Sequence, residues 1–235
     1  MKKILAAVAL VTLCSSVSYA TIVGSKHDLS FGAAGGGPKA EAQTQVCIFC
    51  HTPHNAVQAV PLWNRNAGAA ASTYKLYTSS ASLSHAKGTS SSLDATSISL
   101  FCLNCHDATV AQLGSRVNKQ GAAGTAMAAA AVWTGGDATT GALNIGAGGD
   151  LTNDHPIGFA YPETDATNRL ESAAQALVKV KANKGAAPES AAIFFGPQSN
   201  RMECASCHLV HDNSNGSFLR TTNAASALCT SCHRK

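Results

Sequence analysis

Cysteine and histidine dominate the residues that can do chemistry in this chain, and they occur in one repeated pattern. The chain has 235 residues and nine cysteines, and eight of these form four C-x-x-C-H motifs at residues 47–51, 102–106, 204–208 and 229–233. Two thiols one turn apart can form thioethers with the two vinyl groups at one edge of a haem, and the adjacent imidazole can then bind the iron. The pattern therefore predicts four covalently attached c-type haems. The predicted tethers are Cys47, Cys50, Cys102, Cys105, Cys204, Cys207, Cys229 and Cys232, and the proximal iron ligands are His51, His106, His208 and His233.

Disulfides and zinc are the alternative explanations for these cysteines. Disulfide pairing gives no reason for a histidine after every second cysteine. Zinc is the stronger rival, because the motifs at 204–208 and 229–233 have a spacing close to that of a zinc ribbon. Histidine is only nine of 235 residues, however, and it follows all four cysteine pairs. This regularity favours haem.

Five histidines lie outside the motifs and are the candidates for the second axial position of each iron. We expect His27, His54, His155 and His211 to be distal ligands, and His85 to be the spare because it lies in the serine-rich stretch 79–92. Without the first twenty residues the chain has only two methionines, so methionine cannot be the sixth ligand of every haem. Bis-histidine ligation predicts low reduction potentials.

His54 and His211 each follow a proximal histidine by three residues, which limits the iron that they can reach. Two histidines on opposite faces of one iron hold their Cα atoms about 12–13 Å apart. Three residues span at most about 11 Å when fully extended. We therefore expect each of these histidines to bind a neighbouring haem rather than the haem of its own motif.

The first twenty residues have the composition of a secretory signal peptide. A cationic start, Met1-Lys2-Lys3, precedes an apolar run over 4–13, and small residues stand at the positions expected before a cut after Ala20. The sequence therefore predicts export, with the ninth cysteine, Cys14, removed. No stretch is long and apolar enough to predict a membrane span. The formal charge of +4 gives no strong basic surface and argues against nucleic acid as a partner.

The composition predicts a mostly irregular fold with a few short helices. Serine, threonine, glycine and asparagine dominate much of the chain, and large apolar side chains are few. We expect one tetrahaem cytochrome domain over 21–235 in which the haems form the core, with a Gly/Ala-rich segment at 121–149 as a linker or a packed loop. A 3.6-residue apolar period predicts one helix, capped by Asn168 and Glu171 and ended by Gly185. Its apolar face is predicted to be Leu170, Ala173, Ala174, Leu177 and Val178.

The motifs in their context resemble those of the doubled C-x-x-C-H multihaem cytochromes of dissimilatory metal-reducing bacteria. The resemblance rests on C-x-x-C-H-T-P-H at 47–54, Pro-Leu-Trp-Asn-Arg at 61–65, Asp-His-Pro-Ile-Gly at 154–158 and Met202 before the third motif. Within that family the chain is most similar to the tetrahaem outer-surface cytochromes of the outer-membrane cytochrome E type. Those proteins polymerise into extracellular filaments in which a histidine of one subunit can bind a haem of the next. The resemblance makes His27 a candidate for such a ligand.

Three functions are compatible with these features. The first is electron transfer along an extracellular homopolymer, with other multihaem cytochromes or external acceptors such as metal oxides as partners. The second is a soluble periplasmic tetrahaem shuttle to a reductase. The third is a multihaem oxidoreductase, but such enzymes keep an open iron or an altered motif, and here all four motifs end in histidine with five further histidines available. We therefore expect an electron-transfer protein rather than an enzyme.

Overall fold

The structure is a computed structural model that describes most of the motif-bearing segments. The described residues are 21–36, 38–54, 62–64, 74–77, 93, 95–107, 145–162, 169–184 and 192–234, and the statements below concern these residues. The predicted signal peptide, His85 and residues 121–144 of the Gly/Ala-rich segment lie outside them. All eight motif cysteines and the four histidines that follow them are described.

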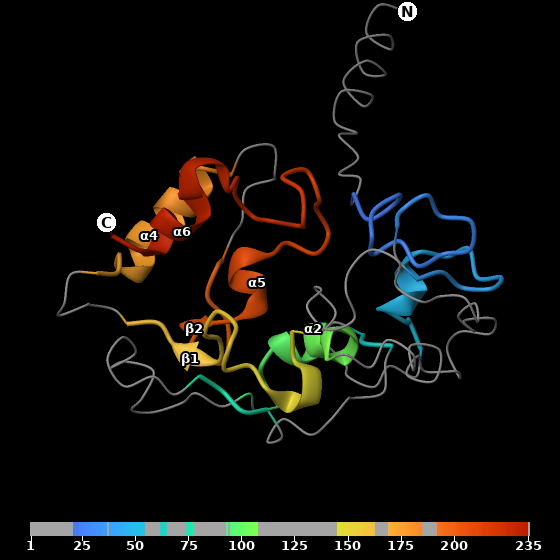
Figure 1. The fold of residues 1–235 in the computed structure, drawn as a ribbon, viewed down its shortest axis with the longest axis horizontal. Coiled ribbons are helices and arrows are strands. Elements are labelled where there is room, and N and C mark those ends of the chain that lie inside the picture. Colours follow the sequence, from blue (N-terminus) through green and yellow to red (C-terminus); the bar gives the residue numbers. More distant parts are fainter. Residues whose placement is uncertain are drawn as a thin grey trace, which may run out of the picture.

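Regular structure is short and scattered, as the composition predicts (Figure 1). The described elements, in chain order, are η1 (Cys47–Phe49), α2 (Ser99–His106), η5 (Ala147–Gly149), β1 (Phe159–Ala160), α4 (Ala173–Ala182), β2 (Arg201–Met202), α5 (Cys204–Cys207), η6 (Ala224–Ser226) and α6 (Ala227–Cys232). The prediction of a mostly irregular chain with a few short helices is therefore confirmed. Each C-x-x-C-H motif falls on a helical turn, in η1, α2, α5 or α6.

A two-stranded antiparallel sheet leads the chain into the third motif. β1 pairs with β2 in the register Phe159 to Met202 and Ala160 to Arg201. A single residue, Glu203, separates β2 from α5, so the sheet fixes the position from which the third motif starts. In Figure 1 the sheet lies next to α5. No helix among the described segments has the length and apolar character that crossing a bilayer requires.

α4 is the predicted helix, but its cap and its buried face differ from the prediction. Ser172 caps it instead: the Ser172 hydroxyl accepts from the Gln175 N–H at 3.3 Å, and the Gln175 side chain accepts from the Ser172 N–H at 3.4 Å. The predicted cap residue Glu171 precedes the helix and pairs with cations, while Asn168 lies outside the described residues. The helix therefore begins at Ala173.

The residues of α4 that are buried lie on a different face of the helix from the predicted one, next to it. Ala176 and Val180 are the buried residues, with Ala173 and Leu177 packed beside them, whereas Val178 is 65% exposed. The reason is the tertiary packing, because α4 packs on α6 and on a core to which β1, β2 and the segments next to them contribute (Figure 1). That core comprises Phe159, Tyr161, Ala176, Val180, Ile193, Phe194 and Met202.

A second, separate apolar cluster surrounds α2. Leu76, Leu93, Leu103 and Leu151 are buried in it, and Leu103 lies inside the second motif, directly after Cys102. Gly146 allows the chain to pass close by, because a Cβ at that position would stand 2.9 Å from the Leu103 side chain. Two small clusters thus hold most of the buried apolar residues that the structure describes, and each packs against a helix that carries a motif, α6 or α2.

Candidate haem-attachment sites

The backbone of three motifs closes into a helical turn through a hydrogen bond from the histidine to the first cysteine. The N–H of the histidine donates to the carbonyl of the first cysteine in the first, third and fourth motifs, at 2.8, 3.1 and 2.8 Å. In the second motif α2 itself supplies the helical geometry. All eight cysteines are free thiols. Among the described residues, no three or more Cys, His, Asp or Glu side chains come together as a metal cluster.

Three of the four motif histidines lie opposite a second histidine, with nearly the same distance between the two ring centroids in each pair. The ring centroids of His51 and His211 lie 6.0 Å apart, with an interplanar angle of 31°. His106 faces His27 at 6.1 Å and 62°.

The third pair is His233 with His155, at 6.3 Å and 71°. Two imidazoles bound to opposite faces of one iron have centroids about 6 Å apart, because each metal–nitrogen bond is near 2 Å. The three spacings therefore fit a haem iron between the two rings.

Backbone carbonyls orient two of the imidazoles for metal binding. The Nδ1–H of His208 donates to the Ser217 carbonyl at 2.9 Å, and that of His155 donates to the Pro156 carbonyl at 3.0 Å. A carbonyl can only accept, so the proton must be on Nδ1, and the lone pair on Nε2 is left for a metal. Such contacts fix the ring orientation and make the imidazole more basic, as they do around metals in other proteins.

Burial favours the neutral form, which is the form that binds iron, in three of the facing histidines, His27, His211 and His233. Burial, helped by the nearby charges of His106 and His208, lowers the pKa of His27 from 6.5 to about 4. Burial and the facing partner also lower the pKa of His211 and of His233. Phe218 covers His27 as a stacked ring at 4.3 Å. These imidazoles are therefore uncharged at neutral pH.

The third motif lies between the second and the fourth. The thiols of Cys102 and Cys204 hydrogen-bond to each other, and this contact raises the pKa of Cys102 well above its usual range. On the other side, burial first and then the nearby Cys232 raise the pKa of Cys207 to about 11. The attachment edges of neighbouring motifs are thus close together in space, although Cys102 and Cys204 are 102 positions apart in the chain.

Aromatic residues link the first motif to the second. Trp63 meets His51 edge-on at 6.2 Å, and its other neighbour, Phe101, lies 4.8 Å away and directly precedes Cys102. Sequence reasoning assigned no role to Phe101 or to Phe218. The position of Phe101 next to a tethering cysteine was the available signal for the first, whereas nothing local distinguishes Phe218.

One predicted distal ligand, His54, and one proximal histidine, His208, have no facing histidine within the described residues. The His54 side chain is exposed, and the backbone carbonyl of His54 accepts from the Thr52 hydroxyl at 2.8 Å. Within the described segments, no histidine ring stands at the 6 Å spacing from His208. His85, the predicted spare, lies outside the described residues.

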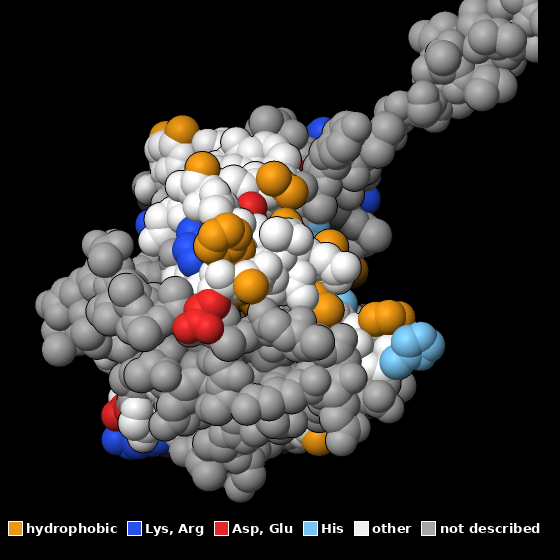
Figure 2. Space-filling view, turned by 90° about the vertical axis from the view of Figure 1, so that its right-hand side faces the viewer, with side chains coloured by type: hydrophobic (Ala, Val, Ile, Leu, Met, Phe, Trp, Pro, Cys, Tyr) orange, Lys and Arg blue, Asp and Glu red, His pale blue; other side chains and the backbone are white. Residues whose placement is uncertain are grey.

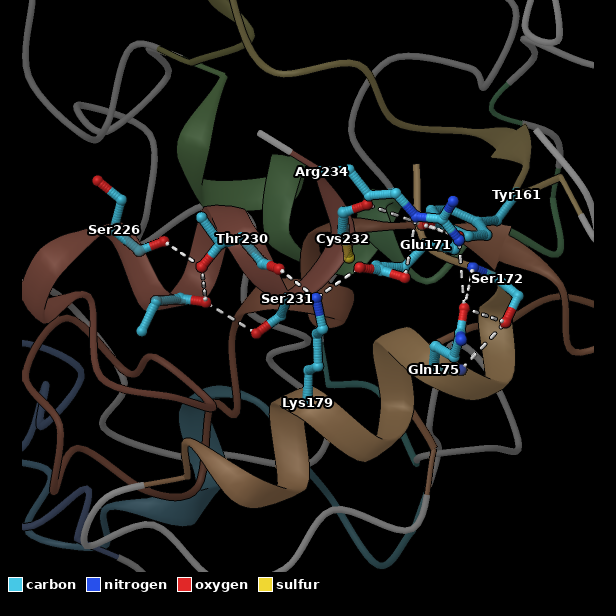
Figure 3. A network of polar contacts seen from close by, with 11 residues as sticks. Tyr161, Glu171, Ser172, Gln175, Lys179, Ser226, Thr230, Ser231, Cys232 and Arg234 are labelled. Atoms are coloured by element: carbon cyan, nitrogen blue, oxygen red, sulfur yellow. Dashed lines mark hydrogen bonds and ion pairs between the residues drawn. The ribbon is translucent and has the colours of Figure 1, made fainter. Parts of the chain in front are cut away.

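A carboxylate clamps the fourth motif to α4 (Figure 3). Glu171 accepts from Lys179 Nζ at 2.5 Å with one oxygen and from Arg234 Nε at 3.2 Å with the other. The Glu171 N–H donates to the carbonyl of Cys232 at 2.8 Å. The clamp therefore ties the segment before α4, and α4 itself through Lys179, to the C-terminal end of α6 and the residues after it.

The Glu171 clamp predicts an acid-sensitive contribution to stability. The hydrogen bond from Lys179, and then that from Arg234, lower the pKa of Glu171 below 4.5 despite its burial. A carboxyl whose pKa is lower in the folded state stabilises the protein above its unfolded pKa and loses this effect as the pH falls. We expect Glu171→Gln to lower the thermal unfolding midpoint at neutral pH and to flatten the decline of that midpoint below pH 4.5. The exposed Glu41→Gln is the control, and equal pH profiles for both variants would contradict the prediction.

Comparison with known proteins finds a family match in the C-terminal part of the chain. A family model described as the doubled CXXCH motif matches residues 196–235, which contain the third and fourth motifs. Curated proteins give no match to the chain. The match shows a feature of multihaem c-type cytochromes, in which CXXCH motifs hold covalently bound haem and serve electron transfer in general.

Proposed function

We propose that the protein binds four c-type haems, each with two histidines on its iron, and transfers electrons as the subunit of an extracellular filament. The observation that supports this best is the spacing of the three histidine pairs, 6.0, 6.1 and 6.3 Å, which suits six-coordinate iron. Bound haem supplies the one-electron chemistry. The protein's residues tether it through paired thiols, hold it between two imidazoles and keep water from the iron.

The contacts between motifs support transfer rather than catalysis at one site. His211, which follows the third motif, faces His51 of the first, so two haem positions share a short peptide segment. The thiols of the second and third motifs touch, and those of the third lie near the fourth. Haem positions so close together favour electron exchange, and two axial imidazoles per iron leave no open site for a substrate.

Assembly with further copies is the part of the proposal that draws on the family resemblance. The structure gives His27 a facing histidine in its own chain, so we propose that His54 rather than His27 binds an iron, that of His208, in the next subunit. The N-terminal segment, shown in blue in Figure 1, exposes Val23 (73%) and Phe31 (58%). Figure 2 views the molecule from this side and shows separate hydrophobic side chains among polar and charged ones. We propose that exposed Val23 and Phe31 contribute to the contact with a second copy.

The proposal is tested by counting haems and by locating the protein. Purified mature protein should contain four haems per chain by the pyridine haemochrome assay, with a fully low-spin spectrum once polymerised. Haem-stained filaments should appear in material sheared from the cell surface. A protein recovered only as a periplasmic monomer would instead support the shuttle, and a five-coordinate iron in the polymer would favour an enzyme.

A further inference from the structure

Glu203 is a buried carboxylate at the junction of the second and third motifs. It directly precedes Cys204 and is 1% exposed. One carboxylate oxygen accepts from the Ser97 hydroxyl at 2.7 Å and from the Ser99 hydroxyl. The serines are 3% and 0% exposed, and they lie at the start of α2 or just before it. The contact therefore joins the beginnings of two motif-bearing helices, α2 and α5, which lie side by side in Figure 1.

No cation neutralises this carboxylate within the described part of the chain. Its donors are the two serine hydroxyls and the backbone N–H of Ser206, all of them neutral, and its second oxygen is buried without a hydrogen-bond partner. Glu171, in contrast, pairs with both a lysine and an arginine. A buried negative charge without a counter-ion is costly, and neutral donors compensate for only part of that cost. Glu203 does cap α5, because its side chain accepts from the Ser206 N–H while the Ser206 hydroxyl accepts from the Glu203 N–H at 2.9 Å. An uncharged serine or threonine would cap the helix as well, so the buried charge calls for a further explanation.

The charge lies close to two haem-attachment edges. The Ser99 hydroxyl that donates to Glu203 also accepts from the Cys204 N–H at 3.0 Å. The Cys204 thiol in turn hydrogen-bonds with that of Cys102, and the negative charge of Glu203 acts on both thiols. In a buried setting the field of a charge is screened far less than at the surface. A negative charge there stabilises ferric over ferrous iron.

We infer that Glu203 is a potential-setting residue, which lowers the reduction potentials of the haems on the second and third motifs relative to the other two. This inference rests on the proposed function, because it requires haem on both motifs. Ser97 and Ser99 act as positioning residues, since they hold the carboxylate between Cys102 and Cys204.

The test is a spectroelectrochemical titration of the haem-loaded Glu203→Gln variant. Removing the charge with little change in shape should shift about half of the haem absorbance, two haems of four, to more positive potential and leave the rest unchanged. Glu203→Asp keeps the charge and should show less than half of that shift. Glu41→Gln makes the same charge change at an exposed position, where solvent screens it, and should leave the titration unaltered.

The outcomes separate this inference from the proposed function. Haem per chain is measured first in the unmodified protein, and a value below four would contradict the proposed function itself. Four haems in Glu203→Gln with unchanged potentials would overturn only the inference. If Glu203→Gln does not load haem, Glu203→Met is titrated in its place, and failure of both to load would show an assembly role and reject the electrostatic one.

Discussion

Replacing His211 with alanine should open the iron of the first motif, although His211 follows the third. The ring of His211 faces that of His51 at 6.0 Å, and the two residues are 160 positions apart. His211 cannot serve the iron bound by His208, because three residues span at most about 11 Å and the two faces of one iron require about 12–13 Å. We expect one quarter of the low-spin ferric signal to be lost in electron paramagnetic resonance, and one carbon monoxide to bind per reduced chain.

Two double variants identify which haem is affected. In His51→Ala/His211→Ala both changes fall on the same iron, so only one haem should depart from the low-spin spectrum. In His208→Ala/His211→Ala the changes fall on different irons, and two haems should depart. The reverse pattern would show that His211 binds the haem of its own motif.

The single variant His211→Met is milder than His211→Ala and should raise the reduction potential of one haem, because histidine–methionine ligation favours ferrous iron.

The attachment chemistry could be predicted from sequence because it is local. A C-x-x-C-H motif carries its two tethers and one ligand within five residues, and a single helical turn is enough to present them. The existence of α4 could be predicted for the same reason, because the apolar residues recur with a helical period within ten consecutive residues. The cap at Ser172 and the identity of the buried residues could not be predicted, because packing on α6 decides which of several nearly equivalent apolar faces is buried.

The partners of the histidines depend on tertiary structure. His27 meets His106 because the N-terminal segment is held near the third motif by Thr21, whose N–H donates to the His211 carbonyl at 3.0 Å. Nothing near His27 in the sequence predicts that contact. Glu203 illustrates the same limit, since its residue type suggests an exposed position, and only the meeting of α2 and α5 buries it.

The second major prediction concerns the iron that His208 binds, which needs a second axial ligand. His208 has its Nδ1 bound to the Ser217 carbonyl, so its Nε2 is available for iron, but no described histidine faces it. His27, His155 and His211 each face another proximal histidine. Of the described histidines outside the motifs only the exposed His54 is left, and we propose it as the donor from a neighbouring copy. We expect His54→Ala to abolish filaments and to leave one open iron per monomer, while His85→Ala leaves both filaments and spin state unchanged.

Mixing two defective subunits distinguishes ligation between chains from ligation within one. His54→Ala retains the His208 iron site but offers no ligand to a neighbour, whereas His208→Ala offers His54 but lacks that site. Each alone should stay monomeric with an open or altered haem. An equimolar mixture should form dimers with one complete junction and recover the low-spin signal of the His54→Ala partner, because the complementary halves meet only once. If His54 binds within its own chain, mixing changes nothing, and if His85 is the ligand, His85→Ala alone opens the iron.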